Sequence, residues 1–332
     1  MFEANTLAAV FAALMGLSIL LYAILDGYDL GVGILLPLEQ AENSNTMIAS
    51  IGPFWDANET WLVLAIGLLL IAFPAAHSYI FEALYLPTAL LLISLVLRGV
   101  AFDFRAKAAF SHKATWNKVF KFGSLTAALS QGYMLGMYVM GFDNSIAAYS
   151  FSLLSAFGVA AAYSYIGACW LIMKTEGCLQ KQAVNWAKKA GWVCFVGVFL
   201  VSLVNPIIND EVYSKWFSWP VAAFLLPLPM VCFMLFMISN KQLKHLPQAN
   251  DKNCWLPFFL AVLVFVLCFI GLAFSFFPYI VPGKLTIWQT ASAPESLSFL
   301  LWGAIVVIPV IGAYTTFSYR VFWGKVRELR YY

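Results

Sequence analysis

Two carboxylates and an amide lie together at the start of a strongly apolar segment. The chain reads IGPFWDANETW at positions 51–61, and the run LVLAIGLLLIAF follows directly. Charge is costly inside a membrane, so an acid at the mouth of a membrane helix is a functional hypothesis by default. A partly desolvated carboxylate can also exchange protons. We therefore predict that Asp56 and Glu59 take part in proton transfer.

The same two acids also fit a structural role. Pro53 and Asp56 can open a helix, with Asp56 as its N-cap and Glu59 as the capping-box partner three residues later. Capping and proton handling are compatible, so both interpretations remain open at this point.

A second acidic pair ends the first apolar segment, which reads LLYAILDGYDLGVGILLP. Asp26 and Asp29 are three residues apart and share one helix face. Gly27 and Gly31 form a small-xxx-small pair, and Gly33 follows, which allows another helix backbone to approach closely. We expect a closely packed face with two acids. The structural alternative is that either aspartate caps or hydrogen-bonds a neighbouring helix.

These acids should lie at one membrane depth, beneath the loop 38–53, which carries two glutamates and no Lys or Arg. Such an arrangement predicts a proton-uptake funnel. The four acids are Asp26, Asp29, Asp56 and Glu59.

A buried cation is expected in the segment VLRGVAFDFRAK. Arg98 is deep enough in this segment to need a partner or to extend its side chain to the interface, and Asp103 follows five residues later. We predict an intramembrane polar pairing of Arg98 and Asp103. An aspartate of the first helix is the other expected partner of Arg98.

Residues that usually bind metals are scarce. The chain has three histidines, His77, His112 and His245, all expected at corners or in loops, whereas membrane haem usually needs His or Met ligands inside a helix bundle. The six cysteines form no C-x-x-C pair and are interpreted as packing residues. We therefore expect no metal site in this chain and no redox or hydrolytic chemistry by this chain alone.

The elements that position these residues must be membrane helices. Of the 332 residues, 62% are apolar and 11% charged, and the mean hydropathy is +0.83, which is typical of an all-α polytopic membrane protein. The net charge of +3 is small and spread over loops, so it gives no indication of a nucleic-acid partner. The first span is expected to be retained because no basic segment precedes it. The nine predicted spans are 6–37, 54–74, 79–103, 117–141, 152–174, 184–208, 217–239, 256–281 and 296–323.

The loops suggest an orientation. Lys and Arg gather after the third, fifth, seventh and ninth spans, and the intervening loops are nearly free of them except for Lys215 and Lys284. The positive-inside rule then predicts an N-terminus outside and a cytoplasmic C-terminus. The short PAAHS corner predicts a tight hairpin of the second and third spans. Prolines should kink the seventh span and break the end of the eighth.

Four segments resemble a known family. DGYDLGVGILLP (26–37) and PFWDANETWLV (53–63) resemble the signature segments of subunit II of the cytochrome bd quinol oxidases. RGVAFDFRAK (98–107) and AFSFFPYIVP…LTIWQTASAPESL (273–297) follow in register. The short length resembles the cyanide-insensitive branch. Ala57 departs from the glycine that is common in the family.

The resemblance implies a fold and a function. It implies a single membrane domain over 1–332, with four-helix bundles at 1–141 and 152–281 and a peripheral ninth helix at 296–323. It also implies a haem-bearing subunit I that holds haems b and d, a quinone pool as substrate source, possible small single-helix subunits, and a bacterial inner membrane. The complex would oxidise quinol and reduce dioxygen to water with protons drawn from the cytoplasm, without pumping.

The resemblance further associates Asp56 with a proton route and Trp61 with an oxygen path. The alternative from another class is a proton-coupled secondary transporter, which acids and kinking prolines also permit. A third possibility is a purely structural subunit whose acids only cap helices.

Overall fold

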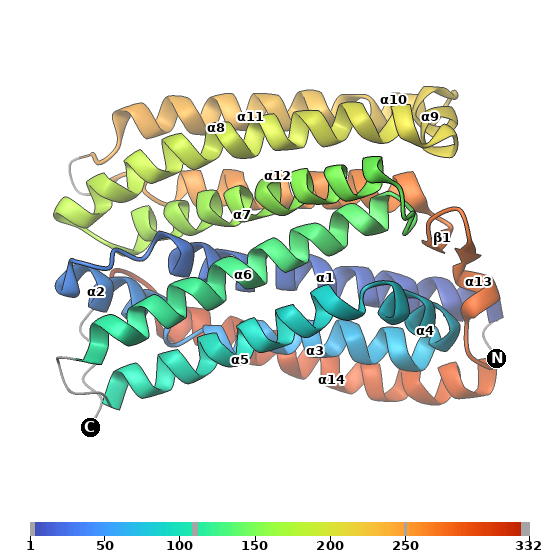
Figure 1. The fold of residues 1–332 in the computed structure, drawn as a ribbon, viewed down its shortest axis with the longest axis horizontal. Coiled ribbons are helices and arrows are strands. Elements are labelled where there is room, and N and C mark those ends of the chain that lie inside the picture. The colour runs from blue at the N-terminus through green and yellow to red at the C-terminus, as the bar shows by residue number, and fades with distance from the viewer. Residues whose placement is uncertain (1–3, 108–111, 249–250, 327–332) are drawn as a thin grey trace.

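Long helices that run side by side form almost the whole molecule (Figure 1). The computed structural model describes residues 4–107, 112–248 and 251–326. The long helices in these ranges are α1 (Ala4–Leu35), α3 (Trp55–Ala72), α5 (Tyr85–Lys107), α6 (Lys113–Val139), α7 (Ile146–Lys174), α8 (Gly177–Ile208), α11 (Pro227–His245), α12 (Leu256–Phe276) and α14 (Pro294–Val321).

Shorter elements cover the two ends of the molecule. At one end lies α2 (Ala41–Ile51), and at the other lie α4 (Pro74–Ala83), α9 (Asp210–Phe217), α10 (Ala222–Leu225) and α13 (Ile287–Thr290) (Figure 1). The strands β1 (Tyr279–Val281) and β2 (Leu285–Thr286) form an antiparallel hairpin beside α13. The long helices therefore connect two capped ends.

The all-α membrane prediction is confirmed. Each of the nine predicted spans coincides with one long helix, and eight helical segments in the described residues are long and apolar enough to cross a membrane. The exception is α6, whose sequence contains the polar residues Lys118, Lys121, Ser130 and Gln131. Neighbouring helices cover much of α6, which explains why it tolerates them.

The prediction of a tight hairpin between the second and third spans is wrong. Pro74 begins a separate helix, α4, which ends at Ala83 before α5 starts. Proline is favoured at the first helical position because its missing N–H would be unpaired there anyway. The two spans are consequently held apart by ten helical residues.

The expected proline breaks are confirmed. Pro227 lies at the first position of α11, where the short α10 gives way to the long helix. The helix α12 ends at Phe276, two residues before Pro278. Proline lacks an amide hydrogen and clashes with the preceding turn. The seventh span is therefore interrupted before Pro227, and the eighth ends before Pro278.

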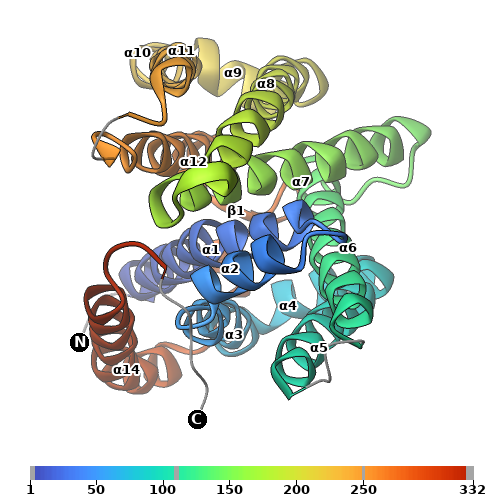
Figure 2. The same ribbon diagram turned by 90° about the vertical axis from the view of Figure 1, so that its left-hand side faces the viewer.

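The helices pack in two groups around a shared seam. α1 packs against α3 and α6, α6 packs against α5, and the second group contains α7, α8, α11 and α12. The groups meet where α1 and α6 lie on α7 (Figure 2). α14 lies at the edge against α1 and α3, and within it only Leu297 and Ser318 are buried. The core of the molecule thus lies around α1 and α7.

The segment that follows α14 crosses the end of α7. The Lys174 ammonium donates to the Phe322 carbonyl at 2.8 Å, and the Val326 amide donates to the Lys174 carbonyl at 2.8 Å. The Lys325 ammonium lies 3.3 Å from a carboxylate oxygen of Asp251, in the connection between α11 and α12. These contacts fix α14 to the second group of helices.

Candidate functional site

A single guanidinium connects two carboxylates inside the first group of helices. Arg98, near the middle of α5, places Nη2 2.6 Å from Asp26 Oδ1 and 3.1 Å from Glu59 Oε1. The side chains of Arg98 and Asp26 are only 1% and 0% exposed, whereas that of Glu59 is 26% exposed. Glu59 is therefore the carboxylate of this group that reaches the surface.

Asp29 lies one turn along α1 and has a different partner. The Asn58 side-chain amide donates to Asp29 Oδ2 at 2.7 Å, and both residues are fully buried. Asn58 precedes Glu59 on α3, so the two neighbouring residues serve the two aspartates of α1. The sequence periodicity explains this, because Asp26 and Asp29 share one face of α1 and α3 packs along it.

Two tyrosines complete the environment of Asn58. Its amide nitrogen lies 3.0 Å from Tyr28 Oη, Tyr28 Oη lies 2.5 Å from Tyr319 Oη, and Tyr319 Oη lies 3.3 Å from Asn58 Oδ1. Tyr28 is fully buried and stacks on Trp170, with ring centroids 4.2 Å apart. Tyr319 comes from α14, so the helix at the edge reaches the interior at this point.

The site contains more potential negative charge than positive charge. One Arg98 faces three carboxyl groups, and isolated ionised carboxylates are costly in a medium of low dielectric constant. Within the carboxylate–Arg98 cluster, four buried atoms have no hydrogen-bond partner among the described residues: Asp26 Oδ2, Asp29 Oδ1, Glu59 Oε1 and Arg98 Nη1. The contact between Glu59 and Arg98 is therefore ionic and is not aligned as a hydrogen bond. Buried polar atoms are rarely left unpaired, so these four atoms identify the site as chemically unusual.

The predicted N-cap of the second span is wrong. The helix α3 begins at Trp55, its N-cap position is Phe54, and no side chain caps it. Phe54 is 1% exposed, so its burial sets the start of the helix. Asp56 is the second residue of α3 and is exposed, and Glu59 faces Arg98 and forms no capping box. An exposed carboxylate in the first turn still interacts favourably with the helix dipole.

Asp103 does not share the environment of Arg98. Asp103 is exposed, whereas Arg98 points to α1 and α3. Five residues along a helix correspond to a rotation of about 140°, so the two side chains face nearly opposite directions. The structure instead places Arg98 against an aspartate of the first helix, the other expected partner.

The two tryptophans of the motif differ in their surroundings. Trp55 is half-buried, packs on Phe102 with centroids 5.0 Å apart, and has its ring 6.0 Å from the Arg98 guanidinium. Trp61 is 4% exposed, and its indole Nε1 has no hydrogen-bond partner among the described residues. Trp55 therefore covers the buried cation, and Trp61 lies in the apolar interior.

The glycines of α1 let two helices approach closely. A Cβ added at Gly31 would lie 1.8 Å from the Tyr163 carbonyl oxygen of α7. An added Cβ would lie 2.7 Å from the Tyr163 ring at Gly27, and 2.1 Å from Ser124 Oγ at Gly33. A side chain at Gly31 would meet backbone atoms of α7, whereas at Gly27 and Gly33 it would displace the side chains of Tyr163 and Ser124. The glycines therefore hold the acidic face of α1 close to α6 and α7.

Sequence reasoning missed Asn58, Tyr28 and Tyr319. Asn58 stands inside the motif, and its position next to Glu59 was a usable signal. Tyr319 could not be found in this way, because it is separated from Asn58 by 261 positions and its helix is otherwise mostly exposed.

Other polar positions lie away from this cluster. His77 stacks on Phe81 in α4, while His112 and His245 lie at the start of α6 and the end of α11. In the described ranges, no group of three or more His, Cys, Asp or Glu side chains has a geometry that could hold a metal.

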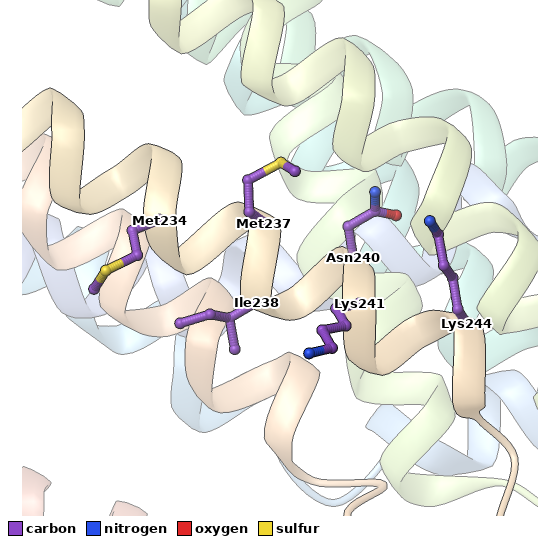
Figure 3. Close-up of a pocket in the computed structure, with 6 residues that line it drawn as sticks. All are labelled: Met234, Met237, Ile238, Asn240, Lys241 and Lys244. Carbon is purple, nitrogen blue, oxygen red and sulfur yellow. The ribbon is translucent and has the colours of Figure 1, made fainter.

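A hollow of about 400 Å³ lies along α11, remote from the acids. Figure 3 shows its lining side chains, all of which come from this one helix. They change from apolar to cationic toward the end of the helix: Met234, Met237, Ile238, Asn240, Lys241 and Lys244. The hollow contains no carboxylate and does not belong to the site.

The fold and the cluster define a class of protein: a polytopic helical membrane protein with a buried, incompletely neutralised carboxylate site. The family model described as cytochrome bd terminal oxidase subunit II matches residues 7–322. The chain belongs to this family.

Characterised relatives agree along nearly the whole chain. Cytochrome bd-I ubiquinol oxidase subunit 2 of Escherichia coli strain K12 is 27% identical over an alignment of 375 positions, which covers 99% of this chain and 97% of that protein. Cytochrome bd ubiquinol oxidase subunit 2 of Bacillus subtilis strain 168 is 28% identical over 324 residues, covering 91% of each.

A solved structure has the same fold as this chain. A chain of the bd oxidase from Geobacillus thermodenitrificans superimposes with a TM-score of 0.77, covering 96% of this chain and 99% of that chain at 18% identity.

Proposed function

We propose that this chain is the subunit without haem in a quinol:dioxygen oxidoreductase and that its buried carboxylates take up protons for the reduction of dioxygen to water. Membership in the subunit II family supports the first part. The observation that carries the second part is the array of Asp26, Asp29 and Glu59 around a single Arg98.

The exposures suggest an order of proton transfer. Glu59 is partly exposed and accepts a proton from the surface, and the fully buried Asp26 lies at the same guanidinium nitrogen, Arg98 Nη2. Arg98 offsets one negative charge, so the carboxylates can change protonation without placing two uncompensated charges in the interior. Asp29 continues the array along α1, while the exposed Asp56 attracts protons at the entrance.

The other side of Asp29 is closed by aromatic rings. Phe54 stacks on Tyr319 with centroids 4.5 Å apart and meets Trp170 edge-on at 5.6 Å. The Lys174 ammonium lies 5.3 Å from the Phe54 ring centroid and 5.0 Å from that of Trp170. A positive charge and packed rings oppose proton entry there, which favours Glu59 as the entrance.

The distribution of Lys and Arg supports a proposed orientation in the membrane. Most of the Lys and Arg lie in helix ends and connections at the end of the molecule that carries α2, where α3, the helix of Glu59, begins (Figure 1). We propose that this end faces the cytoplasm of a bacterial inner membrane. The N-terminus would then be outside and the C-terminus inside, although residues 1–3 and 327–332 lie beyond the described ranges.

The remaining partners complete the proposal. A haem-bearing subunit I would hold haems b and d and supply the redox chemistry, quinol would come from the membrane pool, and small single-helix subunits and membrane lipid would contact the outer helices. The buried Trp61 would line an apolar path for dioxygen.

The test uses the purified two-subunit complex with Glu59→Gln and, separately, Asp26→Asn. Loss of a proton-transfer group should slow quinol-dependent oxygen consumption by about 100-fold or more, with haem content unchanged. The matched control is Glu82→Gln, because Glu82 is an exposed glutamate beyond the opposite end of α3. Normal turnover in both assembled variants would contradict the proton role, and solute flux without oxygen consumption would favour a proton-coupled transporter instead.

A further inference from the structure

The hydroxyl groups of Tyr28 and Tyr319 and the side-chain amide of Asn58 form a closed ring. The three distances are 3.0 Å from Asn58 to Tyr28, 2.5 Å between the two tyrosines, and 3.3 Å from Tyr319 back to Asn58. Each member both donates and accepts, so the ring is satisfied by its own groups. It lies beside Asp29, which Asn58 contacts at 2.7 Å.

In the observed direction the ring presents a donor to Asp29. One N–H group of Asn58 points to Asp29 and the other to Tyr28, while the Leu25 carbonyl lies at a longer 3.3 Å. Tyr28 then donates to Tyr319, and Tyr319 donates to Asn58 Oδ1. This arrangement suits an ionised Asp29, because a carboxylate can only accept hydrogen bonds.

The three groups also satisfy one another when all three hydrogen bonds have the opposite direction. If the Asn58 amide turns over, its nitrogen donates to Tyr319, Tyr319 donates to Tyr28, and Tyr28 donates to Asn58 Oδ1. The carbonyl oxygen of Asn58 then faces Asp29, which suits the protonated carboxyl group because that group carries an O–H donor. The direction of a side-chain amide follows from its hydrogen-bond network, so the protonation of Asp29 selects the direction.

We infer that Tyr319 of α14 is a positioning residue that allows Asn58 to serve Asp29 in both of its protonation states. Without the Tyr319 hydroxyl, the turned Asn58 amide would direct an N–H group at a phenyl side chain that cannot accept it. An unpaired buried donor is costly. The inference rests on the proposed role of these carboxylates in proton uptake. Through Tyr319, the edge helix α14 would take a direct part in proton uptake.

The test compares Tyr319→Phe with Tyr314→Phe in the purified complex. Phenylalanine keeps the stacking of residue 319 on Phe54 and removes only the hydroxyl. Tyr314 lies on the same helix and is 58% exposed, so its variant controls for a general change in α14. Oxygen consumption should fall about two- to tenfold in Tyr319→Phe, which corresponds to one hydrogen bond, and should be unchanged in Tyr314→Phe.

Two further measurements separate positioning from a merely structural role. The infrared carboxyl band that disappears in Asp29→Asn should change in Tyr319→Phe and not in Tyr314→Phe. The double variant Tyr28→Phe/Tyr319→Phe should be no slower than the slower single variant, because both break the same ring, whereas independent effects would multiply.

The outcomes distinguish this inference from the proposed function. If Asp29→Asn turns over normally, the proton role of Asp29 fails. If Asp29→Asn is slow while Tyr319→Phe has normal turnover and an unchanged carboxyl band, only the role of Tyr319 is overturned. Slow turnover with an unchanged band, or multiplied effects in the double variant, also overturns it.

Discussion

At the scale of single residues, the site is governed by an imbalance of charge. Arg98 is nearly inaccessible and contacts two carboxylates, while Asp29 depends on a neutral amide. Removing one member of a buried ion pair leaves an uncompensated charge, which is more destabilising than losing the pair as a whole. Arg98 should therefore matter for stability as well as for turnover.

Arg98→Gln should lower the free energy of unfolding by about 3–5 kcal/mol, because Asp26 would remain buried without a counter-charge. The double variant Asp26→Asn/Arg98→Gln should recover part of this loss. Thermal dissociation of the purified complex measures both. Arg320→Gln is the control, since Arg320 is an exposed arginine in the last turn of α14, and an Arg98 variant as stable as this control would contradict the argument.

At the scale of elements, the helices could be predicted and their exact starts could not. Apolar length and proline positions identify the long helices, because both act locally along the chain. The start of α3 depends on the burial of Phe54 among Trp170 and Tyr319, which are distant in sequence. The helix α4 was missed because the PAAHS letters resemble a corner, although its proline starts a helix.

The candidate site shows the same limit. Its acids and Arg98 stood out because charge is rare in membrane segments, and the glycine spacing indicated a close helix contact. Which partner each acid takes depends on helix rotation and neighbours, so the pairing of Arg98 with Glu59 and the ring around Asn58 required the three-dimensional structure.

Close contact between α1 and α7 should be sensitive to a single methyl group. Gly31→Ala would place a carbon 1.8 Å from the Tyr163 carbonyl oxygen, whereas a Cβ at Gly158 of α7 meets no atom within 4 Å. Gly31→Ala should destabilise the protein by about 1–3 kcal/mol or more through overpacking, and Gly158→Ala should not. The yield of assembled complex measures this, and equal yields would rule out a tight seam at Gly31.

At the scale of the whole molecule, the two ends differ in charge and in structure. One end carries α2 and the basic connections, and the other carries α4, α9 and the β-hairpin (Figure 1). Cys178 is exposed near the start of α8 at the basic end, while Ser78 is exposed in α4 at the opposite end. These two positions report the orientation directly.

A membrane-impermeant maleimide should label Cys178 in inside-out vesicles and leave it unlabelled in right-side-out vesicles. Ser78→Cys, in a chain with Cys178→Ser, should show the reverse pattern. Mass spectrometry of the labelled peptides gives the readout. Labelling of Cys178 from the outer side would invert the proposed topology and would place the Glu59 entrance on the wrong side of the membrane.

The hydroxyl pair of Tyr28 and Tyr319 has a consequence for biosynthesis. Their 291-position separation means that the ring beside Asp29 cannot close until the ribosome has translated nearly all of the described chain. At 5–20 residues per second this delay is roughly 15–60 s. During that interval the Asn58 amide beside Asp29 lacks its Tyr319 partner. The nascent protein thus completes the hydrogen-bonded ring beside Asp29 only near the end of its own synthesis.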